Sequence, residues 1–290
     1  MKKPRRLGKQ IRPYGYILPA VCFLSLFFYY PFVKNTVLSL FSVNKYRQVN
    51  QFVGLQNYAK VFADEKFLLA LRNTLIFVVA TVPATIAIAL GLALLARKRR
   101  RLSPIYEAMF SLSMATSASV IAMIAKLAFD PSMGVVNKVL GMNVHWLSDR
   151  RTALLSVILL QIWGNIGYNF IFLLAALRGI PEDIMESARL DGATGTKLLT
   201  RVMLPLVSPT LLFLIVSGLA CAMTSTTFIL ILTDGGPSGV SQTIVTYVYS
   251  KAVKSSNYSV AFAATTVGFF LTSILLYISF RLDNKKVSYD

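Results

Sequence analysis

Side chains that could perform catalytic or metal chemistry are scarce in this sequence. His145 is the single histidine, and no carboxylate or thiol stands at metal-ligand spacing around it. The chain has no G-x-S-x-G or H-E-x-x-H motif and no pair of carboxylates inside an apolar run. We therefore predict that the chain is not an enzyme and holds no metal.

Uncharged polar side chains are instead placed inside long apolar runs. Asn165, Tyr168 and Asn169 lie in one run, and Thr224 and Thr227 lie in another. Amides and hydroxyls both donate and accept hydrogen bonds, and a tyrosine adds an aromatic face, so these five residues are candidates for binding a neutral polar solute. The alternative, that they satisfy one another between packed helices, stays open.

The elements that carry these residues must lie in a membrane. Of the 290 residues, 55% are hydrophobic and only 14% are charged, and the mean hydropathy is +0.61. A net charge of +18 would suggest nucleic acid binding in a soluble chain, but here the bases cluster between apolar runs. They are explained by retention on the cytoplasmic face and attraction to anionic lipid, so we expect the lipid bilayer and no nucleic acid as a partner.

Six apolar segments reach the length of roughly 20 residues that a helix needs to cross a bilayer. They predict an all-α, polytopic membrane protein with spans at about residues 15–36, 72–96, 106–128, 153–176, 206–232 and 260–281. Around these spans we divide the chain into a basic tail (1–14), a first span with an external loop (15–69), a transmembrane domain (70–281) and a second tail (282–290).

The basic residues also predict the orientation of the spans. The N-terminal tail carries six, Arg97–Arg101 is an unbroken run of five, and the external loops are longer and less densely basic. Both termini and the segment 178–205 are therefore expected on the cytoplasmic side. No ionisable residue falls near a bilayer midplane, which disfavours a stand-alone, ion-coupled secondary carrier, the main alternative hypothesis.

The cytoplasmic segment 178–205 is patterned like two short helices. Pro181 suits a first helical turn, and Ile180, Ile184 and Ala188 form a stripe at helical spacing. We expect a break at Gly192, which can adopt a left-handed conformation, and a second surface helix from about Thr194. The four acids of the segment balance its four bases, which favours a protein partner over lipid.

Within this segment the residues resemble a known family. Glu186-Ser187-Ala188, Asp191-Gly192-Ala193 and the downstream Val202, Leu204 and Pro205 resemble the EAA loop of ABC importer permeases. Ser187 replaces the usual alanine, and Leu199 replaces a common aromatic. The resemblance implies an ATPase-docking surface formed by Glu186, Ser187, Ala188, Asp191, Gly192, Ala193, Leu199 and Pro205. Glu186 would be its ionic contact; a surface pair with Arg189 is the alternative role for that glutamate.

Further segments resemble permeases of the maltose, lactose and glycerol-3-phosphate class. They are Phe52–Tyr58, Gly134–Asn137, Trp146-Leu147 and the turn Leu232–Pro237. The resemblance implies a six-span, MetI-like subunit in a bacterial or archaeal inner membrane. The implied partners are a second homologous permease, two ATP-binding cassette ATPases and an external solute-binding protein. No phosphate loop occurs here, so ATP would be hydrolysed by the partners and no cofactor is expected on this chain.

The resulting functional hypothesis is one half of the translocation path of an ATP-driven carbohydrate importer. A phosphorylated cargo would require an arginine or lysine at mid-depth or helix N-termini, and the spans show no mid-depth base. An unphosphorylated sugar or oligosaccharide is therefore favoured.

Overall fold

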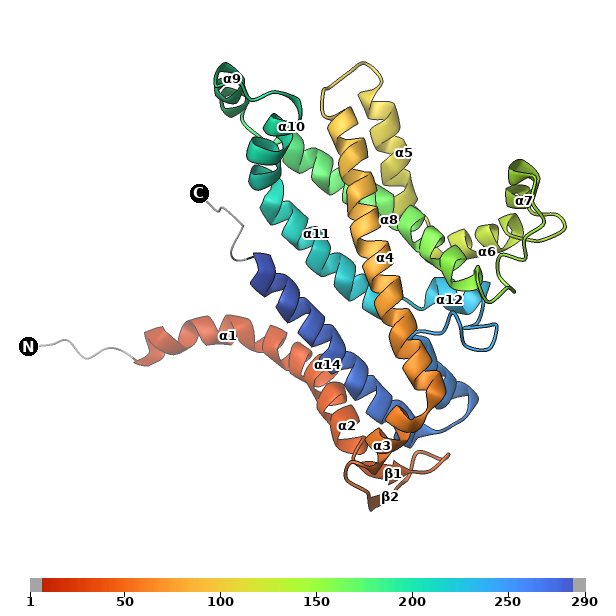
Figure 1. The fold of residues 1–290 in the computed structure, drawn as a ribbon. Helices are drawn as coiled ribbons and strands as arrows, with labels where there is room; N and C mark the ends of the chain where they lie inside the picture. The colour runs from red at the N-terminus through yellow and green to blue at the C-terminus, as the bar shows by residue number, and fades with distance from the viewer. Residues whose placement is uncertain (1–6, 284–290) are drawn as a thin grey trace, which may run out of the picture. The chain divides into compact units, whose positions relative to one another are not determined.

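The computed structural model describes residues 7–283, with side chains from Gly15 to Arg281. The side chains of both predicted tails, 1–14 and 282–290, lie outside this described part. The fold is helical as predicted (Figure 1). Contacts divide the chain into two units, one formed by the chain up to Ala63 with Ser250–Val267, the other by Asp64–Tyr249 with the segment from Gly268. The contact division falls at Ala63, just before the helix of the second span begins at Glu65.

The first unit holds the first span and a small β-hairpin. Its elements are α1 (Leu7–Leu24), a π-helical turn (Ser25–Tyr29), α2 (Tyr30–Leu38), β1 (Phe41–Val43), β2 (Val49–Phe52), α3 (Gln56–Ala63), a π-helical turn (Ser250–Lys254) and the first residues of α14 (Tyr258–Asp283). The strands are antiparallel, with Phe41 opposite Phe52. This hairpin adds a short two-stranded sheet to the predicted all-α fold. It forms because the Asn44 side chain accepts the backbone N–H groups of Tyr46 and Gln48, which closes a tight turn.

The second unit contains the remaining helices. They are α4 (Glu65–Ala96), α5 (Ser103–Ala115), α6 (Ala118–Ala128), α7 (Val135–Leu140), α8 (Ala153–Arg178), α9 (Glu182–Leu190), α10 (Gly195–Leu198), a π-helical turn (Leu199–Met203), α11 (Leu204–Thr224), α12 (Thr227–Leu232), α13 (Ile244–Tyr249) and the remainder of α14. Helix α4 packs along α8 and α11, and α5 packs on α8 (Figure 1). Their buried faces form one apolar cluster, to which Phe77, Leu173 and Ile229 belong.

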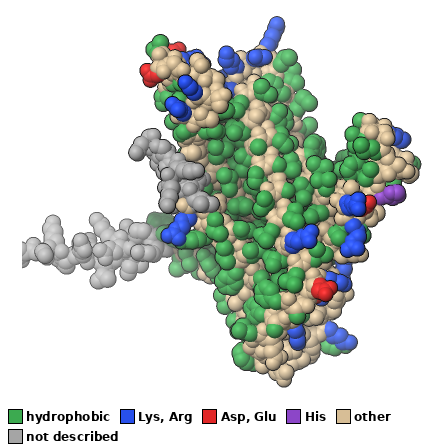
Figure 2. Space-filling model, in the orientation of Figure 1, with side chains coloured by type: hydrophobic (Ala, Val, Ile, Leu, Met, Phe, Trp, Pro, Cys, Tyr) green, Lys and Arg blue, Asp and Glu red, His purple; other side chains and the backbone are tan. Residues whose placement is uncertain are grey.

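The outer surface of these helices suits lipid. Val79, Leu95, Met109 and Leu112 each expose about 70 to 80% of their surface. Figure 2 shows hydrophobic side chains over the flanks of the helices, with Lys and Arg gathered at the link between α4 and α5 and near α9. Contiguous apolar surface of this extent is what a membrane-spanning protein presents to hydrocarbon.

The predicted third span, 106–128, is wrong as a single straight helix. Helices α5 and α6 together have the apolar length of a span, but they meet at an angle of 99°. Thr116 and Ser117 are extended at the break. Hydroxyl groups on this stretch bond to backbone carbonyls, Ser113 to Phe110 and Thr116 to Leu112, and such bonds compete with helix propagation. Within the described residues, five helical segments could span a membrane, or six if the bent pair counts as one.

The predicted fifth span, 206–232, is also interrupted. Helix α11 ends at Thr224, Ser225 is extended, and α12 begins at Thr227. At its other end this span is longer than expected, because the helical segment starts at Gly195 and runs through α10 into α11. The second helix predicted from Thr194 is therefore the beginning of a span and not a separate helix on the membrane surface.

The turn after α12 is held by buried polar side chains. The Asn73 amide donates to the carbonyl oxygens of Gly239 (3.1 Å) and Gln242 (3.0 Å), and the Ser241 hydroxyl donates to Gly236 (2.6 Å). Nearby, the Tyr247 hydroxyl donates to Asp64, the N-cap residue of α4, at 2.8 Å. Burial raises the pKa of Tyr247, and the Asp64 carboxylate adds to this. These bonds fix the N-terminal end of α4 and hence the register of the residues that α4 presents further along.

Candidate functional site

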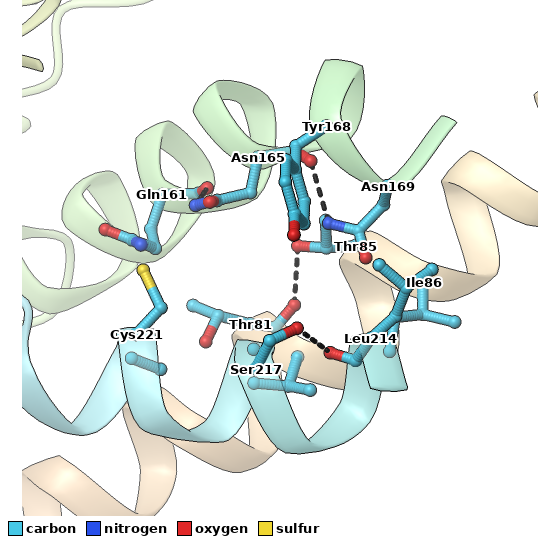
Figure 3. Close-up of a pocket in the computed structure, with 13 residues that line it drawn as sticks. Thr81, Thr85, Ile86, Gln161, Asn165, Tyr168, Asn169, Leu214, Ser217 and Cys221 are labelled. Atoms are coloured by element: carbon cyan, nitrogen blue, oxygen red, sulfur yellow. Dashed lines mark hydrogen bonds between the residues drawn. The ribbon is translucent and has the colours of Figure 1, made fainter. Parts of the chain in front are cut away.

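A pocket of about 240 Å³ opens between α4, α8 and α11 (Figure 3). Its lining is uncharged: Thr81, Val82, Thr85, Ile86, Gln161, Asn165, Tyr168, Asn169, Leu214, Ser217, Gly218, Cys221 and Ala222. Three of the residues proposed from the sequence to contact solute, Asn165, Tyr168 and Asn169, lie on it. Gln161, Thr81, Thr85 and Ser217 are additional polar lining residues that the sequence reasoning missed.

Helical spacing brings these polar groups together. On α8, residues 161, 165, 168 and 169 follow the i, i+4, i+7, i+8 pattern of a single helix face. Thr81 and Thr85 are one turn apart on α4, and Ser217 and Cys221 are one turn apart on α11. Figure 3 shows side chains from the three helices pointing toward the same space. The pocket is therefore a direct result of three polar faces in otherwise apolar helices.

The hydrogen bonds of the pocket leave acceptors available. The amide of Asn165 donates to the Gln161 carbonyl oxygen (2.7 Å), and that of Asn169 donates to the Asn165 carbonyl oxygen (2.9 Å). The hydroxyl of Thr85 donates to its own helix in the same way (2.7 Å). Among the described residues, no hydrogen bond uses the Tyr168 hydroxyl or the side-chain oxygens of the two asparagines. These oxygens could accept hydrogen bonds from solute hydroxyls.

The alternative arrangement, in which the polar residues bond one another across packed helices, occurs at one place along this lining. Ser225 donates to the Gln161 side-chain oxygen at 2.9 Å, which joins the break after α11 to α8. Asn165 and Asn169 take no part in such a cross-helix bond in the part of the chain that the structure describes.

A second pocket of about 480 Å³ adjoins the first and shares Gln161, Asn165, Tyr168 and Cys221 with it. Thr224 and Thr227 line this second pocket, so all five proposed solute-contacting residues lie on the two connected spaces. Both helix breaks, Thr116 and Ser225–Thr226, also border it. Non-helical backbone at membrane depth is tolerated where it is buried in protein or lines a polar cavity, which accounts for the position of the breaks.

The segment 178–205 provides a separate structural feature. Gly192 has a φ of +79°, as predicted, and it ends α9 in a left-handed turn. The Gly192 N–H donates to the Arg189 carbonyl oxygen (3.0 Å) and the Ala193 N–H to the Ala188 carbonyl oxygen (2.9 Å), which is the Schellman pattern of a helix C-terminus. Helix α9 therefore ends in a defined turn that sets the direction of the following chain.

The residues predicted to dock an ATPase differ in exposure. Glu186, Ser187, Asp191 and Gly192 are exposed, whereas Ala188, Ala193 and Pro205 are half-buried. Leu199 packs against the buried apolar cluster, so it supports the segment from within. Among the described side chains, no ion pair joins Glu186 to Arg189; the surface pair considered as its alternative role is not formed.

The predicted apolar stripe of this segment misidentifies the buried residue. Met185 is 1% exposed and joins the buried cluster, while Ile184 is 40% exposed. Ile180 lies before Pro181, and α9 begins only at Glu182. Helical spacing therefore cannot be counted from Ile180, because residues 180 and 181 are not part of the helix.

Comparisons with known proteins agree with this architecture. Residues 85–289 match the family described as binding-protein-dependent transport system inner membrane component. The chain is 31% identical over 284 residues to the sn-glycerol-3-phosphate transport system permease protein UgpA of Agrobacterium fabrum, covering 97% of each protein. It is also 31% identical to the probable ABC transporter permease protein YurN of Bacillus subtilis, over 92% of this chain and 94% of that protein.

Two solved structures share the fold. A bacterial ABC transporter involved in the import of the acidic polysaccharide alginate matches with a TM-score of 0.83 at 24% identity, over 98% of this chain and 100% of that one. The bacterial alginate ABC transporter in complex with a pentasaccharide-bound periplasmic protein matches with a TM-score of 0.82, over 95% and 96% of the two chains. These matches confirm the predicted importer-permease fold. With the family match over most of its length, this chain is an inner membrane component of a binding-protein-dependent ABC transport system.

Proposed function

We propose that this permease carries a carbohydrate and forms one half of the translocation path of an ATP-driven importer. The observation that carries the proposal is the pair of adjoining pockets, because their lining combines amide, hydroxyl and aromatic groups with no charge. Sugar hydroxyls are matched by groups that donate and accept hydrogen bonds, and sugar ring faces by an aromatic such as Tyr168.

The cargo that fits this lining best is an unphosphorylated sugar or oligosaccharide. One relative is named for glycerol-3-phosphate and one fold neighbour imports an acidic polysaccharide, and both cargoes are anionic. A phosphate in a membrane-embedded site calls for arginine, lysine or helix N-termini. The pockets contain no basic residue. These two proteins therefore inform the chemical class of the cargo, and the lining of the pockets favours a neutral member of that class.

The proposed assembly contains a second homologous permease, two ATPase subunits and an external solute-binding protein. Exposed residues of α9, with Glu186 as the ionic contact, would dock one ATPase. ATP would be bound and hydrolysed by those subunits, so this chain would need no cofactor and perform no catalysis. The orientation follows the dense basic link Arg97–Arg101, with both termini and the docking segment on the cytoplasmic side of the inner membrane.

Replacing Glu186 with alanine tests the docking surface. The change should reduce recovery of ATPase subunits with the affinity-purified permease, because it leaves a partner charge unpaired at an interface, a loss of about 2 kcal/mol or more. Glu182→Ala is the matched control: Glu182 is an exposed acid on the same helix. Equal recovery from both variants and the unaltered permease would contradict the assignment of Glu186.

A further inference from the structure

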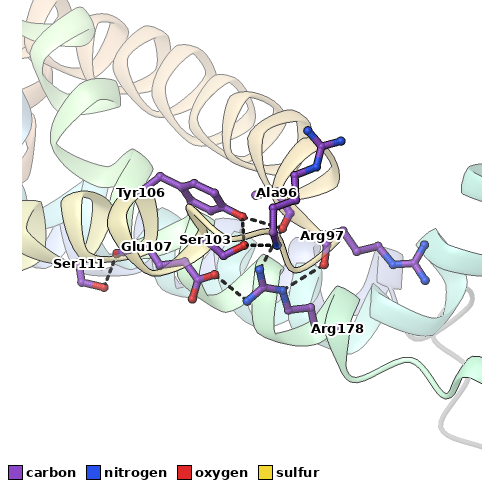
Figure 4. Close-up of polar contacts among 8 residues, drawn as sticks. Ala96, Arg97, Ser103, Tyr106, Glu107, Ser111 and Arg178 are labelled. Carbon is purple, nitrogen blue, oxygen red and sulfur yellow. Dashed lines mark hydrogen bonds and ion pairs between the residues drawn. The ribbon is translucent and has the colours of Figure 1, made fainter.

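Arg178, the last residue of α8, contacts two other helices (Figure 4). Its Nη1 lies 2.8 Å from Oε1 of Glu107 on α5. Its Nε donates to the Arg97 carbonyl oxygen at 3.1 Å, and its Nη2 donates to the Ala96 carbonyl oxygen at 3.0 Å, both at the C-terminal end of α4. A single guanidinium therefore joins the ends of α4, α5 and α8.

The chemistry of this contact is specific to arginine. The last carbonyl groups of a helix have no donor within the helix, and they form the negative end of its dipole. Arg178 supplies two donors to those carbonyls and a third to the carboxylate. A planar guanidinium carries five N–H donors in a fixed fork, whereas a lysine ammonium is a single compact charge. Lysine at this position would not reproduce the three contacts.

The contact is shielded and reinforced by its surroundings. The side chains of Arg178 and Glu107 are 17% and 30% exposed. The Tyr106 hydroxyl donates to the same Ala96 carbonyl oxygen (3.1 Å), and its oxygen lies 2.9 Å from the Ser103 hydroxyl. Limited access of water strengthens electrostatic interactions, so the three helix ends are held more firmly than by an exposed ion pair.

Arg178 also stands immediately before the docking helix. Only Gly179, Ile180 and Pro181 separate it from α9, and the Gly179 N–H still bonds back to Ala175 at 2.9 Å. On α9, Met185 is anchored in the same buried cluster as Leu177, the neighbour of Arg178. A displacement of α9 is thus transmitted to the end of α8 through a short, tethered connection.

We propose that Arg178 is a positioning residue that makes α9 and the cytoplasmic ends of α4 and α5 move as one body. A movement imposed on α9 would then reach α4 and α8, the helices whose polar faces line the pocket. The proposal rests on the proposed function in one respect, that an ATPase subunit docks on α9. Coupling two sites requires such a connected element with two discrete positions.

The test is a distance measurement by pulsed electron spin resonance in the complete purified complex. Spin labels are placed at Glu182, on the exposed first turn of α9, and at Met109, on the exposed side of α5, after both native cysteines are changed to alanine. Distances are compared without nucleotide and with Mg-ATP and vanadate. The variants are Arg178→Gln and Arg178→Lys, with Arg99→Gln as control because Arg99 is an exposed arginine of the α4–α5 link.

In the labelled cysteine-free chain with no further change, and in the same chain with Arg99→Gln, the distance between the labels should be the same in both nucleotide states. In Arg178→Gln and Arg178→Lys, it should shift by about 2 Å or more on adding nucleotide, the scale of helix displacements in coupled transitions. ATP hydrolysis by these two complexes should also lose about fivefold or more of its stimulation by loaded binding protein.

Constant distance and full stimulation in both Arg178 variants would overturn the proposal, as would equal effects in Arg99→Gln. If Arg178→Gln yields no assembled complex, the label distance and the stimulation of ATP hydrolysis in the Arg178→Lys complex decide the test. If neither variant assembles, Arg178 is required for folding, and the proposal is also overturned. Failure of the proposed docking is recognised separately, because the unaltered permease would then purify without ATPase subunits.

Discussion

At the scale of single residues, Gly192 determines how the chain leaves α9, the helix proposed to dock an ATPase. Its φ of +79° lies in the left-handed region, and a Cβ placed there would meet no atom within 4 Å. A substitution would therefore be strained by its backbone conformation and not by crowding, at a cost of roughly 1 to 2 kcal/mol for an L side chain.

Gly192→Val should misdirect the chain after α9, so that transport falls several-fold while the amount of permease in the membrane is unchanged. Gly141→Val is the matched control, because Gly141 also has a positive φ (+62°) and open space around its Cβ position but follows α7, far along the chain from the docking segment. Uptake and immunoblot signal are measured together. A similar loss of transport in both variants would argue against a specific role for the Gly192 turn.

Asn165 is the pocket residue whose replacement should be most informative, since it lines both connected spaces. Asn165→Leu removes its free acceptor, and loss of one hydrogen bond of about 1 to 2 kcal/mol corresponds to roughly a tenfold weaker interaction with cargo. Uptake at limiting sugar concentration should fall accordingly. Trp163→Leu, at a 56% exposed position on the same helix outside the pocket lining, should retain uptake. Unimpaired uptake by Asn165→Leu would remove this residue from the cargo path.

At the scale of elements, the second pocket is bordered by α5 and α8, which approach each other closely. Gly167 makes this approach possible, because a Cβ there would overlap the Phe110 carbonyl oxygen and the Ser113 hydroxyl of α5. Packing this tight between helices in a membrane relies on small residues.

Gly167→Val should separate α5 from α8 and lower stability by about 1 to 3 kcal/mol, the usual cost of overpacking. The expected observation is a lower unfolding temperature of the purified complex in detergent. Gly91→Val serves as the control, because a Cβ at Gly91 meets nothing within 4 Å and its φ is ordinary. An unfolding temperature equal to that of the unaltered complex would show that α5 and α8 do not need this contact.

The elements also show what the sequence could and could not predict. Apolar runs located the spans because bilayer crossing depends on length and composition alone. The breaks at Thr116–Ser117 and Ser225–Thr226 were missed because hydropathy does not register hydroxyl groups that compete for backbone carbonyls. Gln161 was missed although its spacing from Asn165 and Tyr168 is helical; projecting the whole of α8 onto one face would have found it.

At the scale of the whole molecule, the described part of the permease combines uncharged pockets with a short helix, α9, to which we assign ATPase docking. The unit from Asp64 holds both features, the two pockets that share residues of α8 and α11, and the Schellman-capped α9. In the proposed account, a displacement of α9 is transmitted through Arg178 to α4 and α8 and changes access to the pockets. The partner subunits hydrolyse ATP, and the binding protein delivers cargo from outside.

The most direct measurement is uptake by proteoliposomes that contain the complete complex and the binding protein. Each of a panel of radiolabelled mono- and oligosaccharides is offered, together with glycerol-3-phosphate and amino acids for comparison, with and without ATP on the cytoplasmic side. The account predicts uptake of an unphosphorylated sugar that requires ATP, resists a protonophore and is lost when the ATPase subunits are omitted. Uptake driven by an ion gradient without ATP, or uptake of amino acids alone, would contradict it.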